Sequence, residues 1–484
     1  MAMMEPIARP SPNPNPSILF LRASSSVRRI SSVAASRFPF DRWRSRPRFR
    51  AAPPRSADAS LPKSEHDVVV VGAGIIGLTI ARQILVASDL SVAVVDAAVP
   101  CSGATGAGQG YIWMANKTLG SETWELAARS KQLWEKLSES IRDQGKDPAQ
   151  VLGWKKTGSL LVGRTQEEMH MLKKRVKQLN ESGLRAEYLS TSSLQLKEPA
   201  LKIGKEGGAA FVPDDCQLDA SQTVAFIEEG NKQFLSHGRY AEFYNDPALS
   251  LVSSASAQIV GIQTSKRNLY AKRAVVIAAG TWSGTLMQNL LVQPNILPNI
   301  PVMPRKGYLI VLENFNKLHL NHGVMEVGYM NHHRSTSGAV ENYQSLPSIS
   351  MTATLDVKGN LLLGNSRNSA FGSSRQFVGF NRELDESIVQ QILDRAGQFF
   401  PALNALSLDI KIGKRIRIGH RPYMPDGKPV IGPVPGFPNL FLAAGHEGSG
   451  LSLALGTAEM VTNMITGDSR TIDHKPYSVE GRFC

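Results

Sequence analysis

Cysteine is scarce in this sequence, which has only Cys101, Cys216 and Cys484 in 484 residues. None of the three belongs to a Cys-x-x-Cys pair, which excludes a zinc ribbon and a dithiol redox motif. The density is also far below that of a disulfide-stapled domain. Long apolar runs are missing as well, since no stretch reaches the roughly 18–20 residues of a membrane span. The sequence therefore predicts neither a metal site nor a transmembrane segment.

Acidic residues are almost absent from residues 1–57, which contain 11 arginines, no lysine, and only Glu5 and Asp41 as acids. This segment accounts for +9 of the net charge of +13, so the rest of the chain has no strong basic excess. A nucleic-acid-binding protein would carry its basic surface on the folded part. We therefore exclude nucleic acid as a partner.

The composition of residues 1–57, rich in Ser, Arg, Pro and Ala, is typical of an organelle transit peptide. The apolar core of a secretory signal is missing. The serine clusters favour a chloroplast, whereas the arginines of residues 42–50 leave a mitochondrion open. A disordered tail without an address is the other alternative. We expect this segment to be disordered, which leaves enough chain for two or three domains.

A strand–helix–strand unit opens the remaining chain. Asp67–Gly72 is a β-branched run typical of a strand buried on both faces. Ile75–Val86 is expected to be a helix, and Ser91–Asp96 a second apolar strand, which together predict a parallel βαβ unit. Further helices are expected at Thr123–Ile141, Glu167–Leu179, Leu384–Phe399 and Leu451–Ile465, and further strands at Thr157–Val162, Ala274–Ala279, Leu361–Gly364 and Leu440–Ala444.

The turn between the first strand and its helix has the sequence Gly72-Ala73-Gly74-Ile75-Ile76-Gly77. Asp96 follows 19 residues after Gly77, close to the spacing of a dinucleotide-binding motif. Glycines at these places permit the tight turn, the approach of the backbone to a pyrophosphate, and close packing of helix on strand. The turn by itself does not distinguish FAD from NAD.

Three later segments favour FAD: Cys101–Gly110, whose Ser102 and Thr105 hydroxyls could reach a pyrophosphate; Val275–Ser283; and Ala443–Leu451. A flexible surface loop is the alternative for Cys101–Gly110. Together the three resemble the D-amino-acid oxidase family of flavoproteins, which includes glycine oxidase, sarcosine oxidase and D-amino-acid dehydrogenase. The resemblance runs from about His66 to Ile465. Its motifs, in chain order, are GAGIIG, SGATGAGQG, KTGSLLV, VVIAAGTWS, PRKGY, LLLGNSR, GHRPYMPDGKPVIGP and AAGHEGSGLSLALGTAE.

The resemblance implies an α/β fold in two domains. A Rossmann-like FAD-binding domain would be assembled from discontinuous segments, beside a substrate domain built on an antiparallel sheet. The implied FAD-binding segments are 66–150, 209–300 and 410–470, and the implied substrate segments are 151–208 and 301–409.

The resemblance implies that Arg421 binds the substrate carboxylate, because it stands in the family's R-P-x-x-x-D-G-x-P stretch. A guanidinium matches a carboxylate at two points. A structural pairing of Arg421 with Asp426 is the alternative. The resemblance also implies that Gly445–Gly450 faces the pyrimidine end of the flavin, where a helix N-terminus would raise the redox potential. His446 is expected either to line this edge or to be structural.

The sequence departs from the family at Tyr308, where Gln is frequent, and at Asn368, where an acid is frequent. Both positions are expected to border the substrate. No cysteine lies between Arg421 and Leu451, and no histidine lies in Cys101–Gly110, so we expect FAD to be bound non-covalently.

The stretch 313–350 is polar and is expected to be a surface insertion, with an active-site lid as the alternative. It contains His319, His322, His332 and His333, but no cysteine, and Glu326 completes a metal site poorly.

The expected activity is oxidation of the C–N bond of a small amino acid or amine by hydride transfer to flavin N5, with oxygen or another acceptor taking the electrons. Two alternatives stay open: a dehydrogenase that passes electrons to a quinone or an electron-transfer protein, and a flavin-bearing assembly or scaffold protein of an organelle. The candidate catalytic residues are Arg421, His446 and Tyr308. The candidate FAD-binding residues are Gly72, Ala73, Gly74, Ile75, Ile76, Gly77, Asp96, Ser102, Ala104, Thr105, Gly110, Gly280, Trp282, Gly445, Gly448, Gly450 and Leu451.

Overall fold

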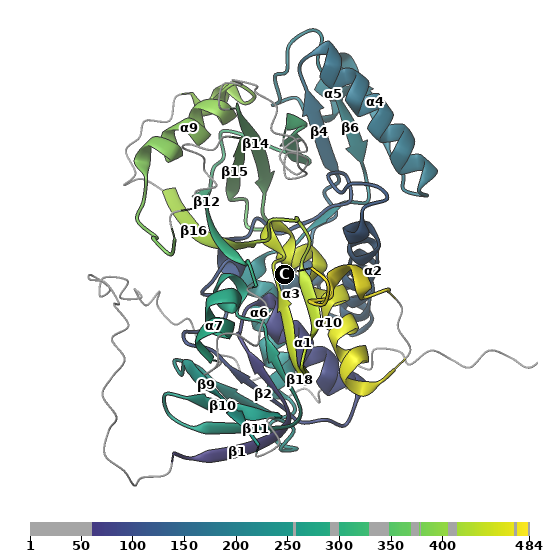
Figure 1. The fold of residues 1–484 in the computed structure, drawn as a ribbon. Helices are drawn as coiled ribbons and strands as arrows, with labels where there is room; N and C mark the ends of the chain where they lie inside the picture. Colours follow the sequence, from purple (N-terminus) through teal and green to yellow (C-terminus); the bar gives the residue numbers. More distant parts are fainter. Residues whose placement is uncertain are drawn as a thin grey trace, which may run out of the picture. The chain divides into compact units, whose positions relative to one another are not determined.

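The computed structural model describes residues 61–254, 258–290, 300–328, 348–368, 377, 379–404, 414–468 and 472–482. The chain divides into two units, Met1–Pro62 and Lys63–Cys484, and all the described helices and strands belong to the second (Figure 1). Residues 1–57, the predicted transit segment, lie outside the described residues.

The first of two large sheets is mostly parallel, and six of its strands follow the order β17-β18-β11-β1-β2-β8. Strands β1, β2, β8, β11 and β18 pair in parallel, whereas β9, β10 and β17 are antiparallel additions. The bounds are β1 (Lys63–Val71), β2 (Val92–Val95), β8 (Tyr240–Phe243), β9 (Ala248–Ser253), β10 (Ile259–Thr264), β11 (Asn268–Ile277), β17 (Val430–Val434) and β18 (Phe437–Ala444). The strands come from distant parts of the chain, so this Rossmann-like sheet is discontinuous in sequence, as predicted.

Four helices pack around one another beside this sheet: α1 (Ile75–Ala87), α2 (Glu122–Asp143), α6 (Ala220–Lys232) and α10 (Gly450–Thr466). Helix α1 lies against both α6 and α10, and α10 also lies against α2. The fully buried Trp134 of α2 donates its indole N–H to the Leu451 carbonyl at 3.0 Å, which fixes the start of α10. Two short helices, α3 (Pro148–Leu152) and α7 (Ser283–Leu290), complete this part.

The second sheet has the order β16-β12-β15-β14-β13-β4-β6-β5. All its pairs are antiparallel except β13 with β4, which confirms the predicted antiparallel sheet. The bounds are β4 (Ser159–Gly163), β5 (Glu187–Ser190), β6 (Gly208–Val212), β12 (Met303–Leu312), β13 (Gly323–Glu326), β14 (Ser348–Leu355), β15 (Leu361–Asn368) and β16 (Lys414–Tyr423). A separate two-stranded pair joins β3 (Tyr111–Ile112) to β7 (Cys216–Gln217).

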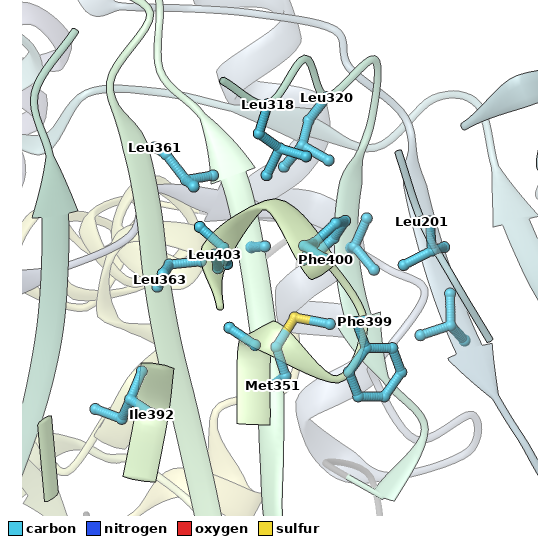
Figure 2. Close-up of a cluster of buried hydrophobic side chains, with 14 of the residues drawn as sticks. Leu201, Leu318, Leu320, Met351, Leu361, Leu363, Ile392, Phe399, Phe400 and Leu403 are labelled. Atoms are coloured by element: carbon cyan, nitrogen blue, oxygen red, sulfur yellow. The ribbon is translucent and has the colours of Figure 1, made fainter. Parts of the chain in front are cut away.

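The core of the second sheet lies under α9 (Glu386–Gly397), which packs on β14 and β15 (Figure 1). Figure 2 shows Leu363 of β15 beside Leu403 and Met351 of β14 near Phe399, within the cluster that also contains Leu361 of β15 and Ile392 of α9. Helices α4 (Gln166–Glu181) and α5 (Thr191–Lys197) pack on β5 and β6. Helix α5 lies on the same face of the sheet as α9, whereas α4 packs on the opposite face at β4 and β6. The face away from α9 is therefore available to the cofactor segments at β12, β15 and β16.

The prediction of a surface insertion at 313–350 is wrong for its described part. Leu318 and Leu320 are buried in the core, and all four residues of β13 are buried between β14 and β4. Glu326 at the end of β13 is buried too, and it pairs with Arg395. The sequence did not predict strand β13, because the stretch around it is polar and its partner strands lie elsewhere in the chain. Residues 329–347, including His332 and His333, lie outside the described residues.

Two strands sit differently from the predicted segments. Strands β6 and β16 belong to the second sheet, although 209–300 and 410–470 were predicted for the FAD-binding domain. The long pairing of β16 with β12 explains the second case, because all ten residues of β16 pair with β12 before the chain returns to the first sheet at β17. The division into domains stays a prediction.

Candidate cofactor and substrate site

The turn between β1 and α1 is glycine-rich because backbone occupies the space that side chains would need. Gly72 has a φ of +119°, and a Cβ there would overlap the Ala278 carbonyl and lie 3.2 Å from the Ala279 Cα. A Cβ at Gly77 would overlap the Gly72 carbonyl oxygen and lie 3.2 Å from Val70 Cγ1. The second contact is the close packing of helix on strand that the sequence predicted for Gly77.

The N-terminus of α1 is suited to a phosphate. Its N-cap residue is Gly74, which has no side chain to cap the helix, and no acidic residue lies in the first turn. Thr105 Oγ1 accepts a hydrogen bond from the Ile75 amide at 3.2 Å, so the Cys101–Gly110 segment covers this helix end. A positive helix end with a hydroxyl beside it and a glycine cradle below fits a pyrophosphate.

Asp96 lies just beyond the end of β2 and supports the glycine turn. Its two carboxylate oxygens accept hydrogen bonds from the Ala73 and Ala98 amides, each at 2.7 Å. Burial raises the pKa of Asp96, and the two hydrogen bonds oppose that rise. The carboxylate therefore positions the turn directly. From this place it would also accept hydrogen bonds from the adenosine ribose hydroxyls of a bound dinucleotide, the role of the acidic residue in this motif.

Three contacts bring the remaining predicted segments together. A Cβ at Gly103 would lie 3.7 Å from the Trp282 ring, and a Cβ at Gly108 would lie 2.7 Å from Leu451 Cδ1. A Cβ at Gly419 would lie 2.7 Å from Ala107 Cβ and 3.4 Å from Ala104 Cα. The Cys101–Gly110 segment therefore touches the 3₁₀ turn η2 (Gly280–Trp282), the start of α10, and strand β16 of the second sheet.

The η2 turn contains polar groups that lack protein partners. Gly280 has a φ of +56°, and the hydroxyls of Thr281 and Ser283 are buried without a hydrogen-bond partner among the described residues. Orphaned buried hydroxyls beside a glycine cradle fit a site built for a polar group such as a dinucleotide. The arrangement of α1, Asp96, Cys101–Gly110 and η2 therefore fits FAD.

A match to a family profile decides between the dinucleotides. The profile of the FAD-dependent oxidoreductase (DAO) family matches residues 67–464, which is most of the chain. The chain belongs to this family. It is an FAD-dependent oxidoreductase, as the resemblance implied, and FAD is its cofactor.

Individual relatives agree with this assignment. Glycine oxidase of Pseudomonas aeruginosa is 25% identical over 425 residues, which cover 86% of this chain and 99% of the relative. The crystal structure of glycine oxidase from Geobacillus kaustophilus superposes with a TM-score of 0.69 at 22% identity, covering 87% of this chain and 100% of that one. The crystal structure of L-proline dehydrogenase from P. horikoshii gives a TM-score of 0.70 at 20% identity, with 87% and 98% covered. At these identities the two structures show the fold alone.

Arg421 of the oxidoreductase lies on the face of β16 that meets the cofactor segments. Gly419, two residues earlier on the same face, packs against Ala104 and Ala107. The guanidinium of Arg421 lies over Gly307 of β12, where a Cβ would overlap Nη1 and Cζ and lie 2.7 Å from Nη2. Asp426, the alternative structural partner, pairs instead with Arg482 at 2.7 Å.

Tyr308 lies on the other face of the sheet, which corrects its prediction as a residue near the substrate. It is paired with Ile418 and belongs to the core under α9, whereas Arg305 and Gly307 share the face of Arg421. The alternation of side chains along a strand accounts for this, since neighbouring residues point to opposite faces. The side chain of Asn368 lies outside the described part.

His446 is buried, and its Nε2 lies 3.0 Å from the Thr457 hydroxyl of α10. Burial lowers its pKa to about 3, so the ring is neutral at physiological pH. This contact favours the structural alternative for His446 over a role at the flavin edge.

The other predicted cofactor-binding residues differ in their surroundings. Gly110 is required by the backbone, because a Cβ there would overlap Leu218, whose amide donates to the Gly110 carbonyl at 2.9 Å. Gly445 has a φ of +76° and packs on Met424. Gly450 and Leu451 begin α10, while Ala73 and Ile75 are buried in the turn and Ile76, Ser102 and Gly448 are partly or fully exposed.

Sequence reasoning missed a group of charged residues at the start of α10. Arg305 and Glu447 form an ion pair whose side chains are only 11% and 14% exposed. Lys117 donates a hydrogen bond to Ser449 Oγ at 2.7 Å. Glu447 stands within the AAGHEGSGL motif, and its non-glycine φ of +47° marks it as unusual. Lys117 carried no sequence signal.

Two observations concern other kinds of site. Within the described ranges, no helix has the length and apolar character needed to cross a bilayer. In the same parts of the chain, no three His, Cys, Asp or Glu side chains come together as ligands for a metal ion. His322 instead lies with its Nδ1 3.2 Å from Glu198 Oε2.

Proposed function

We propose that this oxidoreductase oxidises the C–N bond of a small amino acid, with Arg421 binding the substrate carboxylate. The observation that carries the proposal is the position of Arg421, on the face of β16 that packs against the Cys101–Gly110 segment. A carboxylate held there would lie beside the cofactor segments. The glycine oxidase of Pseudomonas aeruginosa, which is similar along nearly its whole length, supports an amino-acid substrate.

The chain's own contribution is to bind and orient. Arg421 would fix the carboxylate at two points, and the absent side chain at Gly307 leaves room for the guanidinium in this orientation. Such positioning contributes several kcal/mol to a reaction barrier. FAD, when bound, supplies the two-electron acceptor. The substrate would lose a hydride from Cα and a proton from nitrogen, and the resulting imine would hydrolyse in water to a keto acid and ammonia.

The test is anaerobic flavin bleaching with a panel of amino acids and of amines that lack a carboxylate. Wild-type protein is expected to bleach with one or more amino acids. In Arg421→Ala the rate of flavin bleaching by carboxylate substrates is expected to fall about 100-fold, because a charged two-point contact contributes about 1.5–3 kcal/mol. Arg415→Ala is the matched control, since Arg415 is an exposed arginine on the same face of β16.

The outcomes separate the alternatives. Equal bleaching of wild type and Arg421→Ala by an amino acid would show that Arg421 does not bind the carboxylate. Bleaching without subsequent oxygen consumption would favour a dehydrogenase that uses a quinone or an electron-transfer protein. A flavin that no member of the panel reduces would favour the assembly or scaffold protein.

We also propose that residues 1–57 direct the chain to the chloroplast, with the mitochondrion as the alternative. The support is the composition of this segment, with its 11 arginines and two acids. A fluorescent fusion of residues 1–57, expressed in plant cells, would show plastid, mitochondrial or diffuse signal. A diffuse signal would contradict both addresses.

A further inference from the structure

Lys117 places an ammonium group at the N-terminus of α10. Its Nζ donates a hydrogen bond to the hydroxyl of Ser449, the N-cap residue of this 17-residue helix, at 2.7 Å. Burial lowers the pKa of Lys117 to about 8, and the nearby Glu447 and Asp215 oppose that change. The group is therefore mostly protonated at neutral pH.

The loop that carries Lys117 is held by two buried charged residues. Arg175 of α4 donates to the carbonyls of Ala115 at 2.9 Å and Met114 at 3.1 Å, and also to the Lys117 carbonyl. Asp215 accepts hydrogen bonds from the Met114 amide at 2.8 Å and the Ala115 amide at 3.1 Å. Arg175 and Asp215 make most of their hydrogen bonds with the backbone of residues 114–117. The position of Lys117 is therefore fixed by two residues from separate parts of the chain.

The electrostatic setting of Lys117 is incomplete within the protein. No carboxylate lies within ion-pair distance of its Nζ in the described ranges, and the nearby Glu447 is paired with Arg305. A cation is also disfavoured at the positive end of a helix. A lysine held there by buried Arg175 and Asp215 therefore calls for an additional negative charge next to Ser449.

We propose that Lys117, together with the N-terminus of α10, stabilises the negative charge that bound FAD acquires on reduction. The proposal rests on the proposed function and on the place of Gly445–Gly450 at the pyrimidine end of the flavin, which the family resemblance implies. The protein would use a lysine from a remote loop to raise the flavin's redox potential, in addition to the helix end. Lys117 is thus a residue that tunes the cofactor, and it has no contact with the substrate carboxylate in this scheme.

The test is the equilibrium of the full-length, FAD-loaded protein with a reference dye during slow chemical reduction. In Lys117→Gln, the ratio of reduced to oxidised flavin at a given dye potential is expected to fall about tenfold, which corresponds to about 30 mV for a two-electron couple. Lys117→Arg keeps the charge and is expected to stay within about twofold of wild type. Lys232→Gln is the control, because it removes a half-buried lysine of α6 that pairs with Glu228 at 2.6 Å.

A second pair of variants covers a failure of Lys117→Gln to fold. Ser449→Asp places a carboxylate beside Lys117 and is a favoured N-cap, whereas Ser449→Asn is a neutral N-cap. The Asp variant is expected to lower the reduced fraction and the Asn variant to leave it unchanged. Equal ratios for Lys117→Gln and wild type, or for the two Ser449 variants when Lys117→Gln does not fold, would overturn the proposal. Chemical reduction needs no substrate, so failure of the amino-acid panel is a separate result that concerns the proposed function alone.

Discussion

The guanidinium of Arg421 lies over the backbone of Gly307, which is paired with Gly419 on the adjacent strand. No other residue type leaves room for it, because a Cβ at position 307 would overlap Nη1 and Cζ. The orientation of the Arg421 guanidinium, the proposed substrate-binding group, thus depends on the absence of a side chain at Gly307 on the neighbouring strand.

Gly307→Ala is therefore expected to displace Arg421 and to raise the KM for a carboxylate substrate about tenfold to 100-fold, by loss of roughly 1.5–3 kcal/mol. The FAD content should stay near that of wild type, because the atoms nearest to a Cβ at Gly307 all belong to the Arg421 guanidinium. Steady-state kinetics with the best amino acid of the panel, together with flavin absorbance, measures both. An unchanged KM would show that Arg421 does not need this orientation.

Gly77→Ala is expected to cost roughly 2–4 kcal/mol of stability and most of the FAD, because the added Cβ would overlap the Gly72 carbonyl oxygen. Gly74→Ala is the matched comparison, since its Cβ would lie 3.3 Å from Thr105 Oγ1, which can yield slightly. Thermal unfolding and FAD titration of the two purified variants measure the difference. Equal losses in both variants would contradict the packing explanation.

The neutral His446 should make stability depend on pH. Its pKa of about 3 in the folded protein lies below the unfolded value of about 6.5, so the unfolded chain binds the extra proton between these limits. This contribution is complete above about pH 6.5 and is lost as the pH falls. When the pH falls from 6.5 to 5, the free energy of unfolding of wild type is expected to decrease by roughly 2 kcal/mol more than that of His446→Gln.

Urea unfolding of wild type and His446→Gln at the two pH values would measure this change. His319→Gln serves as the control because His319 is exposed. A wild-type protein that loses no more stability than His446→Gln over this range would show that His446 is not held neutral.

Removing one partner of the Arg305–Glu447 ion pair is expected to destabilise the protein more than removing both partners. Glu447→Gln leaves the largely buried Arg305 without its carboxylate, which costs about 3 kcal/mol. The double variant Arg305→Met, Glu447→Gln removes both charges and should recover part of that loss. Denaturant unfolding of the wild type, both single variants and the double variant completes the double-mutant cycle. If the double variant loses as much stability as the two single variants together, Arg305 and Glu447 are not coupled.

Much of the first sheet and its cofactor turn followed from the sequence alone. The β-branched runs of β1 and β11 and the glycines of the β1–α1 turn predict buried parallel strands around a dinucleotide, because local propensity and backbone sterics depend on nearby residues only. The Asp96 spacing and the ordered motifs then implied FAD, which the family match shows.

The tertiary structure decided what depends on remote pairing. The alternation in β12 separates Gly307 from Tyr308, but only the packing of α9 on one face and of Ala104 and Ala107 on the other shows which of them meets the site. Strand β13 was missed because its partners β4 and β14 are distant in the chain. Lys117 was missed for the same reason, since the helix end that its ammonium group contacts lies more than 300 residues away in the chain.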